Sequence, residues 1–152
     1  MDLAPDFDEF IGLLIAREVE FLIVGAYALA FHGAPRYTGD IDILIRPTIE
    51  NAKRTLTVIE GFGFPINKLT PDDLINTRRM LEMGVEPVQI HIMSSISGVA
   101  WEDAWATRVV SNFGHHDAAF IGRDEFLRNK RAAGRPKDLA DIDALTPGQR
   151  DS

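Results

Sequence analysis

The chain has 152 residues, of which 45% are hydrophobic and 26% are charged, a balance that excludes disordered, collagen-like and coiled-coil proteins. It carries 16 Lys and Arg against 23 Asp and Glu, a net charge of −7, which makes it a poor non-specific binder of nucleic-acid phosphates. It has no cysteine, which excludes disulfides, thiol catalysis and thiolate zinc sites. The length predicts one domain over residues 1–152, and the cytoplasm is the default location. We expect no membrane contact, because the longest strongly apolar stretch, 21–31, is too short to span a bilayer.

The spacing of apolar residues predicts helices and strands mixed along the whole chain. In chain order they are a helix over 6–17, a strand over 21–24, a helix over 26–31, a strand over 39–45, helices over 48–60 and 71–74, strands over 78–83 and 87–93, a helix over 101–105, strands over 108–110 and 118–121, and helices over 125–133 and 136–145. Turns are expected at Gly84–Val85 and Asn112–Gly114, and Asp124 is expected to cap the helix after it. This order predicts an α/β or α+β fold with a small mixed sheet.

Two carboxylates stand out on the second predicted strand. Asp40 and Asp42 alternate with Ile41 and Ile43, so both carboxylates face one side of the strand, about 6.5–7 Å apart. That separation suits one or two divalent cations, and Mg²⁺ prefers oxygen ligands. The alternative is an edge strand whose outer face is wet. The apolar surroundings favour a ligand, because a buried carboxylate is costly unless it is paired.

The stretch FLIVGAYALAFHGAPRYTGDIDILI, residues 21–45, resembles the signature of the DNA polymerase β-like nucleotidyltransferase superfamily. That signature is an apolar strand, a Gly-Gly or Gly-Ser pair, a helix, and Asp-x-Asp on the next strand. Arg36, Thr38, Asp40 and Asp42 match the Arg-x-Thr-x-Asp-x-Asp pattern of its small prokaryotic members.

The resemblance extends to the C-terminal part of the chain. Residues 130–142, KRAAGRPKDLADI, are similar to the tails of the same small members, which include abortive-infection-type toxins. The resemblance is strong over about 20–45 and moderate over 85–145, and elsewhere it concerns only the order of elements.

The resemblance implies a polymerase β-like core, a small mixed sheet flanked by helices, that moves a nucleoside monophosphate from an NTP to an acceptor and releases pyrophosphate. It implies that Asp40 and Asp42 bind Mg²⁺ or Mn²⁺, and that Gly25 and Ala26 offer backbone groups to the β- and γ-phosphates. By analogy with the toxin-type relatives, the acceptor is an RNA end, such as that of a tRNA, or a protein. An antitoxin partner or a homodimer would supply further recognition surface.

Three more residues gain a role from the resemblance. Arg36 either pairs with a phosphate or forms a salt bridge with one of the two aspartates, and Thr38 is expected to shape the turn rather than to contact substrate. Lys130 lies in a basic stretch, 123–137, and either points at the triphosphate or the acceptor or belongs to a solvated helix face.

The chain departs from the family at the third carboxylate, whose position falls at His91. An imidazole can serve as a neutral metal ligand or as a general base, and it suits Mn²⁺ or Zn²⁺ better than Mg²⁺. Glu86 lies five residues from it along the chain, too far to replace it. The departure leaves a second interpretation open: a catalytically impaired module that binds a nucleotide or a partner in the same cleft.

Overall fold

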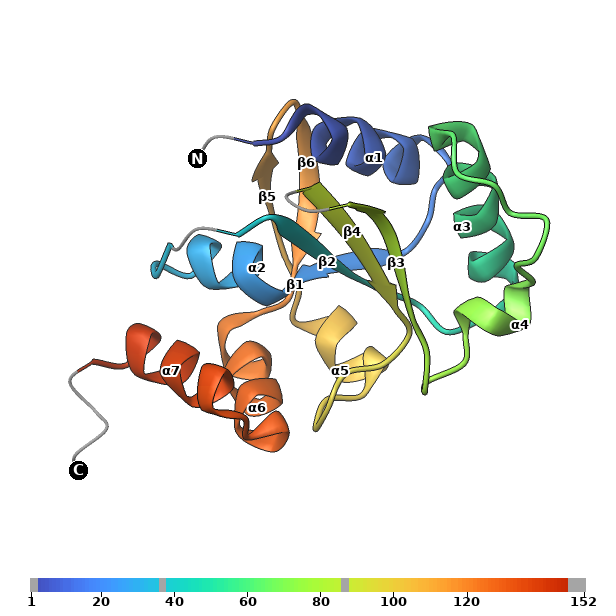
Figure 1. Cartoon of the computed structure of the whole chain (residues 1–152). Helices are drawn as coiled ribbons and strands as arrows, with labels where there is room; N and C mark the ends of the chain where they lie inside the picture. Colours follow the sequence, from blue (N-terminus) through green and yellow to red (C-terminus); the bar gives the residue numbers. More distant parts are fainter. Residues whose placement is uncertain (1–2, 36–37, 86–87, 148–152) are drawn as a thin grey trace.

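The computed structural model describes residues 3–35, 38–85 and 88–147, and Figure 1 shows the arrangement of its elements. In chain order these are α1 (Pro5–Ala16), β1 (Phe21–Val24), α2 (Gly25–Phe31), β2 (Asp40–Ile45), α3 (Ile49–Phe62), α4 (Pro71–Leu74), β3 (Met80–Val85), β4 (Val88–Met93), α5 (Trp101–Ala106), β5 (Val109–Phe113), β6 (His116–Phe120), α6 (Arg123–Ala133) and α7 (Pro136–Leu145). Both the types and the order of the elements agree with the sequence prediction.

The strands form one six-stranded sheet in the order β3-β4-β2-β1-β6-β5. β1 is antiparallel to β2 and parallel to β6, and β2 is parallel to β4. The outer pairs, β3 with β4 and β5 with β6, are antiparallel hairpins. The predicted small mixed sheet is therefore confirmed.

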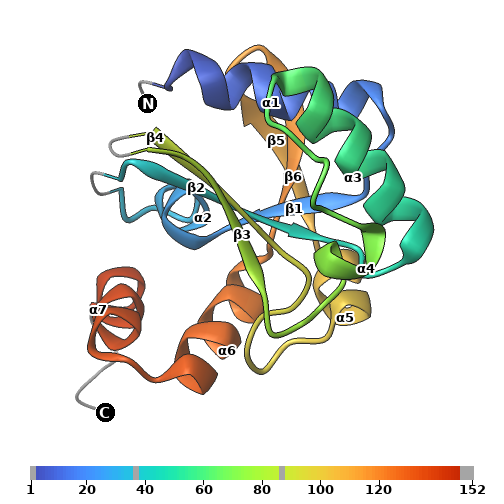
Figure 2. The same ribbon diagram turned by 45° about the vertical axis from the view of Figure 1, so that its right-hand side comes forward.

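The sheet is buried on both faces. Phe21 and Ile23 of β1 pack into a core with α1 and α3, whereas Leu22 and Val24 pack into a second core with α2, α5 and α6. Figures 1 and 2 show α1 and α3 together on one side of the sheet, and α5 and α6 on the other, with α7 beyond α6. Burial on both faces explains why β1 is apolar at every position rather than at alternate ones.

Three local predictions were wrong. β3 continues through Gly84 to Val85, and β5 continues to Phe113, because cross-strand pairing extends further along both hairpins than the turn residues indicate. The helix α6 begins at Arg123 with Gly122 as its N-cap, so Asp124 lies inside the first turn instead of capping it.

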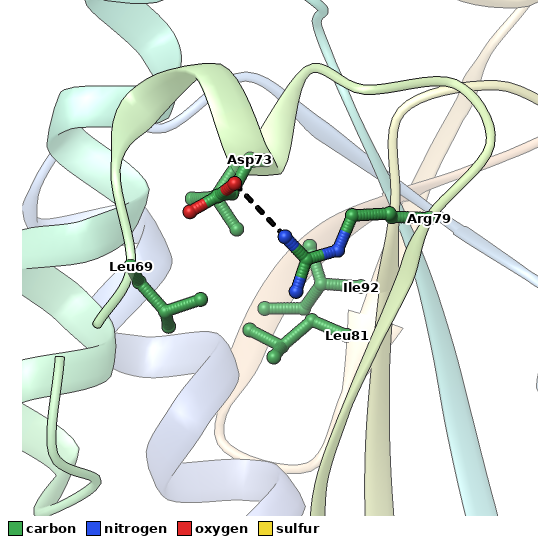
Figure 3. Close-up of a pocket in the computed structure, with 6 residues that line it drawn as sticks. Leu69, Asp73, Arg79, Leu81 and Ile92 are labelled. Atoms are coloured by element: carbon green, nitrogen blue, oxygen red, sulfur yellow. Dashed lines mark hydrogen bonds and ion pairs between the residues drawn. The ribbon is translucent and has the colours of Figure 1, made fainter.

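A small cavity lies between α4 and the face of the sheet that packs on α3 (Figure 3). Leu69, Leu81 and Ile92 line it, and an ion pair of 2.8 Å between Asp73 and Arg79 closes it. Its volume of about 10 Å³ has room for about one water, so it is a packing defect under α4 and not a ligand site. No helix within the described ranges has the length and apolar character needed to cross a bilayer.

Candidate active site

A cleft of about 690 Å³ opens where β1 ends, between the sheet and the residues of α6 and α7. Five residues singled out from the sequence line it: Gly25, Asp40, Asp42, His91 and Lys130. Residues far apart in the chain are therefore brought to one place by the sheet order and by the return of the C-terminal helices. Ala26, the next residue after Gly25, is buried in the first turn of α2.

The pairing of the strands places the polar residues of the site in a row across the sheet. Val24 of β1 pairs with Asp42 of β2, Asp42 pairs with His91 of β4, and His91 pairs with Glu82 of β3. Directly paired residues project from the same face of a sheet. Sequence reasoning missed Glu82, because its place opposite His91 depends on the register of the β3–β4 hairpin.

Gly25 is required at its position for two reasons. Its φ of +68° lies in the left-handed region, which disfavours residues with a side chain. A Cβ at Gly25 would also overlap Asp42 Oδ2. The glycine therefore lets the Asp42 carboxylate lie directly against the backbone at the end of β1.

His91 is bound to the Asp42 carboxylate. Its Nδ1 donates to Asp42 Oδ1 at 2.9 Å, and its Nε2 lies 3.3 Å from Gln89 Oε1. Because an ionised carboxylate only accepts hydrogen bonds, the proton of the ring belongs on Nδ1. Only 13% of the His91 side chain is exposed, so the ring is held in one orientation. Nε2 is the ring nitrogen that can exchange its partner.

Asp40 carries an unsatisfied oxygen. Its Oδ1 is buried and has no hydrogen-bond partner among the described residues. The turn before it is held by Thr38, whose Oγ1 accepts from the Asp40 amide and donates to the Asp40 carbonyl, both at 3.1 Å. These two bonds agree with a role for Thr38 in shaping the turn, and its relation to a substrate stays a prediction. Arg36 lies outside the described residues. A buried unpaired carboxylate oxygen is costly, and here it indicates a ligand such as a cation.

The donor set fits a hard cation held with the help of a substrate. Within the described ranges no cluster of three or more His, Asp or Glu side chains is arranged to hold a metal ion. Asp40 and Asp42 nevertheless present carboxylates to one cleft. Mg²⁺ commonly takes one or two carboxylates and completes its shell with waters and substrate phosphates, so these two residues suffice for such a site.

Lys130 reaches the cleft, but its charge is shared with two buried aspartates. Its Nζ lies 3.3 Å from both Asp138 Oδ1 and Asp141 Oδ2. Asp138, which is fully buried, also accepts from the backbone and side chain of Arg135. Burial alone would raise the pKa of Asp138, but the hydrogen bonds from Arg135 and the charge of Lys130 lower it to about 2. This network fixes α7 against α6 along one wall of the cleft.

The charge of Arg135 is close enough to Asp42 to be influenced by it. Its pKa is raised, chiefly by the hydrogen bond to Asp138 and in smaller part by the charges of Asp141 and Asp42. Lys137, which also lines the cleft, has no ion pair or hydrogen bond among the described residues. Against the two buried aspartates, Asp138 and Asp141, the cations Lys130, Arg135 and Lys137 leave this wall with an excess of one positive charge. The wall faces the acidic floor formed by Asp40 and Asp42.

The sequence matches no protein-family model and no curated protein. The structure, however, resembles solved structures over nearly its whole length. The lincosamide antibiotic adenylyltransferase LnuA, solved with lincomycin bound, superposes with a TM-score of 0.61 at 12% identity, over 95% of this chain and 96% of that one. This chain has the nucleotidyltransferase fold. The predicted fold is therefore confirmed.

Two further nucleotidyltransferase-fold structures agree with this result. A putative nucleotidyltransferase from Thermotoga maritima superposes with a TM-score of 0.59 at 13% identity, over 96% of this chain and 91% of that one. An antigenic nucleotidyltransferase-like protein from Paracoccidioides brasiliensis superposes with a TM-score of 0.53 at 16% identity, over 93% of this chain and 75% of that one. At these identities the likeness concerns the nucleotidyltransferase fold, and the chemistry of this chain has to be argued from its own residues.

Proposed function

We propose that this protein is a metal-dependent nucleotidyltransferase that moves a nucleoside monophosphate from an NTP to an acceptor hydroxyl and releases pyrophosphate. The observation that carries the proposal is the position of Asp42. It lies against Gly25 on one side, bonds His91 on the other, and shares its cleft with the unsatisfied Asp40 oxygen. In a nucleotidyltransferase fold this arrangement supports phosphoryl chemistry better than a structural role, because two carboxylates in an apolar strand need a compensating charge.

Asp40 and Asp42 are the residues that would hold Mg²⁺ or Mn²⁺. When bound, such a cation supplies charge neutralisation at the α-phosphate and the departing pyrophosphate. The triphosphate is assigned to the backbone of Gly25 and Ala26 and to the cationic wall, where Lys130 is oriented by Asp138 and Asp141. From the sequence resemblance, Arg36 is assigned to a phosphate or to a salt bridge with one of the two aspartates.

His91 acts as the general base. Because Asp42 accepts the Nδ1 proton, the lone pair of the neutral ring lies on Nε2. Gln89 Oε1, 3.3 Å from Nε2, is itself an acceptor and does not satisfy that lone pair, so a substrate hydroxyl can take its place. The acceptor oxygen bonds to the α-phosphorus as its proton moves to Nε2. The bond from the α-phosphorus to the bridging oxygen breaks, and pyrophosphate leaves with that electron pair.

Two classes of acceptor follow from different comparisons. The sequence resemblance to toxin-type members supports an RNA end, such as that of a tRNA, or a protein, with an antitoxin or a second copy of the chain as partner. The structural likeness to LnuA, named as a lincosamide antibiotic adenylyltransferase, supports a small molecule.

A second function is favoured by His91 itself: with an imidazole where the family has a carboxylate, the cleft could bind a nucleotide without transferring it.

Replacing His91 tests the transfer reaction. The protein is incubated with each α-³²P-labelled NTP, Mg²⁺ or Mn²⁺, and cell extract separated into RNA, protein and small molecules. We expect label to enter one fraction. His91→Asn keeps a donor near Asp42 but removes the base, so the transfer rate should fall at least about 100-fold while nucleotide binding persists. Unchanged transfer by His91→Asn would remove His91 from the mechanism, and nucleotide binding without any transfer by the wild type would favour the non-catalytic module.

A further inference from the structure

Glu82 lies beside the proposed machinery without belonging to it. It pairs directly with His91 across the β3–β4 hairpin, so its side chain projects from the cleft face of the sheet. It is exposed, and among the described residues no hydrogen bond or ion pair engages it. An unpaired carboxylate one strand away from the general base is available to a substrate.

The row across the sheet gives this carboxylate a place in the reaction. In sheet order the row runs from Val24, with Gly25 next to it, through Asp42 and His91 to Glu82, a distance of about 14 Å at three strand spacings. In an in-line displacement the nucleophile and the leaving group lie on opposite sides of the phosphorus. If pyrophosphate leaves at the Gly25 end, the acceptor enters at the Glu82 end.

The surface around Glu82 differs from the triphosphate end. Met80 and Met93 pair across the same hairpin and line the cleft, and methionine side chains form an adaptable apolar surface. The lysines and arginines that line the cleft all lie within residues 130–137, on the opposite wall. Thr77 and Ser95, joined by a hydrogen bond, line the cleft beside the two methionines. The acceptor end therefore combines an apolar platform and two hydroxyl side chains with the Glu82 carboxylate at its edge.

From this arrangement we infer that the acceptor is a small cationic alcohol, and that Glu82 binds its positive group while His91 receives its hydroxyl proton. The inference rests on the proposed function. An RNA end would bring phosphates toward Glu82 and the aspartates of a protein with a net charge of −7, which is unfavourable. A cleft of about 690 Å³ has the size of a small-molecule site, and it must hold the nucleotide as well.

A matched pair of probes tests the charge preference. Choline and 3,3-dimethylbutan-1-ol have nearly the same shape, but only choline carries a positive charge. The protein is labelled with ¹³C at its methionine methyl groups and loaded with a non-hydrolysable ATP analogue and Mg²⁺. We expect both probes to move the signals of Met80 and Met93, with choline half-saturating at about a fivefold lower concentration. Met83, which is buried in the core with α1 and α3, should not move.

Variants assign the preference to one residue. Glu82→Gln should abolish the difference between the probes, whereas Glu60→Gln, at an exposed position of α3, should retain it. Equal binding of the two probes, a preference that survives in Glu82→Gln, or tighter binding of an RNA oligonucleotide ending in CCA at the same methyl groups would overturn the inference. Calorimetry of the ATP analogue distinguishes a failure of the proposed function from a failure of the acceptor class alone. If neither this analogue nor those of the other NTPs bind, the proposed function fails too. If an analogue binds and the probes do not differ, only the acceptor class is wrong.

Discussion

Gly25 is the residue at which the site tolerates least change. An alanine there would have to adopt a φ of +68° and would place its Cβ on the Asp42 carboxylate. Gly33 is a matched control. Its φ of +114° is also left-handed, but apart from its chain neighbours no atom of the described residues lies within 4 Å of an added Cβ. The two positions therefore separate backbone strain from displacement of Asp42.

We expect Gly33→Ala to lower the free energy of unfolding by about 1–2 kcal/mol, the cost of a left-handed alanine, and to leave nucleotide binding intact. Gly25→Ala should destabilise the protein further and abolish nucleotide binding, because Asp42 must move. Chemical denaturation and calorimetry measure the two effects. If Gly25→Ala binds nucleotide as the wild type does, the contact between Gly25 and Asp42 does not organise the site.

At the scale of elements, the junction of α6 and α7 depends on pH through Asp138. The pKa of this carboxyl is about 2 in the folded protein, against an ordinary value of 3.8. A lowered pKa means that the unfolded chain binds the proton more tightly, so the ionised group stabilises the fold above pH 3.8. That stabilisation, about 2 kcal/mol, is lost as the pH falls from 3.8 toward 2.

Asp138→Asn removes this contribution. We expect the variant to unfold more easily than the wild type at pH 6, and the difference in free energy of unfolding to shrink by about 2 kcal/mol as the pH is lowered to 2.5. Urea denaturation at both values measures it. A difference that does not change with pH would mean that Asp138 acts only through packing and neutral hydrogen bonds, and not through its charge beside Lys130 and Arg135.

The hairpins show where sequence reasoning stops. Local patterns locate β3 and β4, but a turn at Gly84–Val85 would set Arg78 or Arg79 opposite His91, whereas the observed pairing sets Glu82 there. A shift of a few residues in a register changes which side chains share a face. Glycine marks flexible backbone without saying whether the pairing continues through it, so Glu82 could not be identified beforehand.

At the scale of the whole molecule, the Asp40–Asp42 pair could be predicted because all the residues that define it lie within one short stretch of chain. The other side of the cleft could not. β1 lies between β2 and β6. α6 and α7 follow the last hairpin on the same side of the sheet as α5 (Figures 1 and 2), and residues of both helices line the cleft. These long-range arrangements place Lys130 at the site. They also place Asp138 and Asp141 beside Lys130, where they balance its charge. Sequence similarity to a motif indicates the lysine but not its partners.

We expect the cleft to bind a nucleoside triphosphate through a cation held by Asp40 and Asp42. Calorimetric titration of ATP, and then of the other NTPs, into the protein with Mg²⁺ or Mn²⁺ tests it without knowledge of the acceptor. Asp42→Asn is the control, because it keeps the shape of the side chain and removes its charge. We expect saturable binding of an NTP that requires the metal and is lost in Asp42→Asn. Failure of every NTP to bind with either metal, or equal binding by Asp42→Asn, would contradict it.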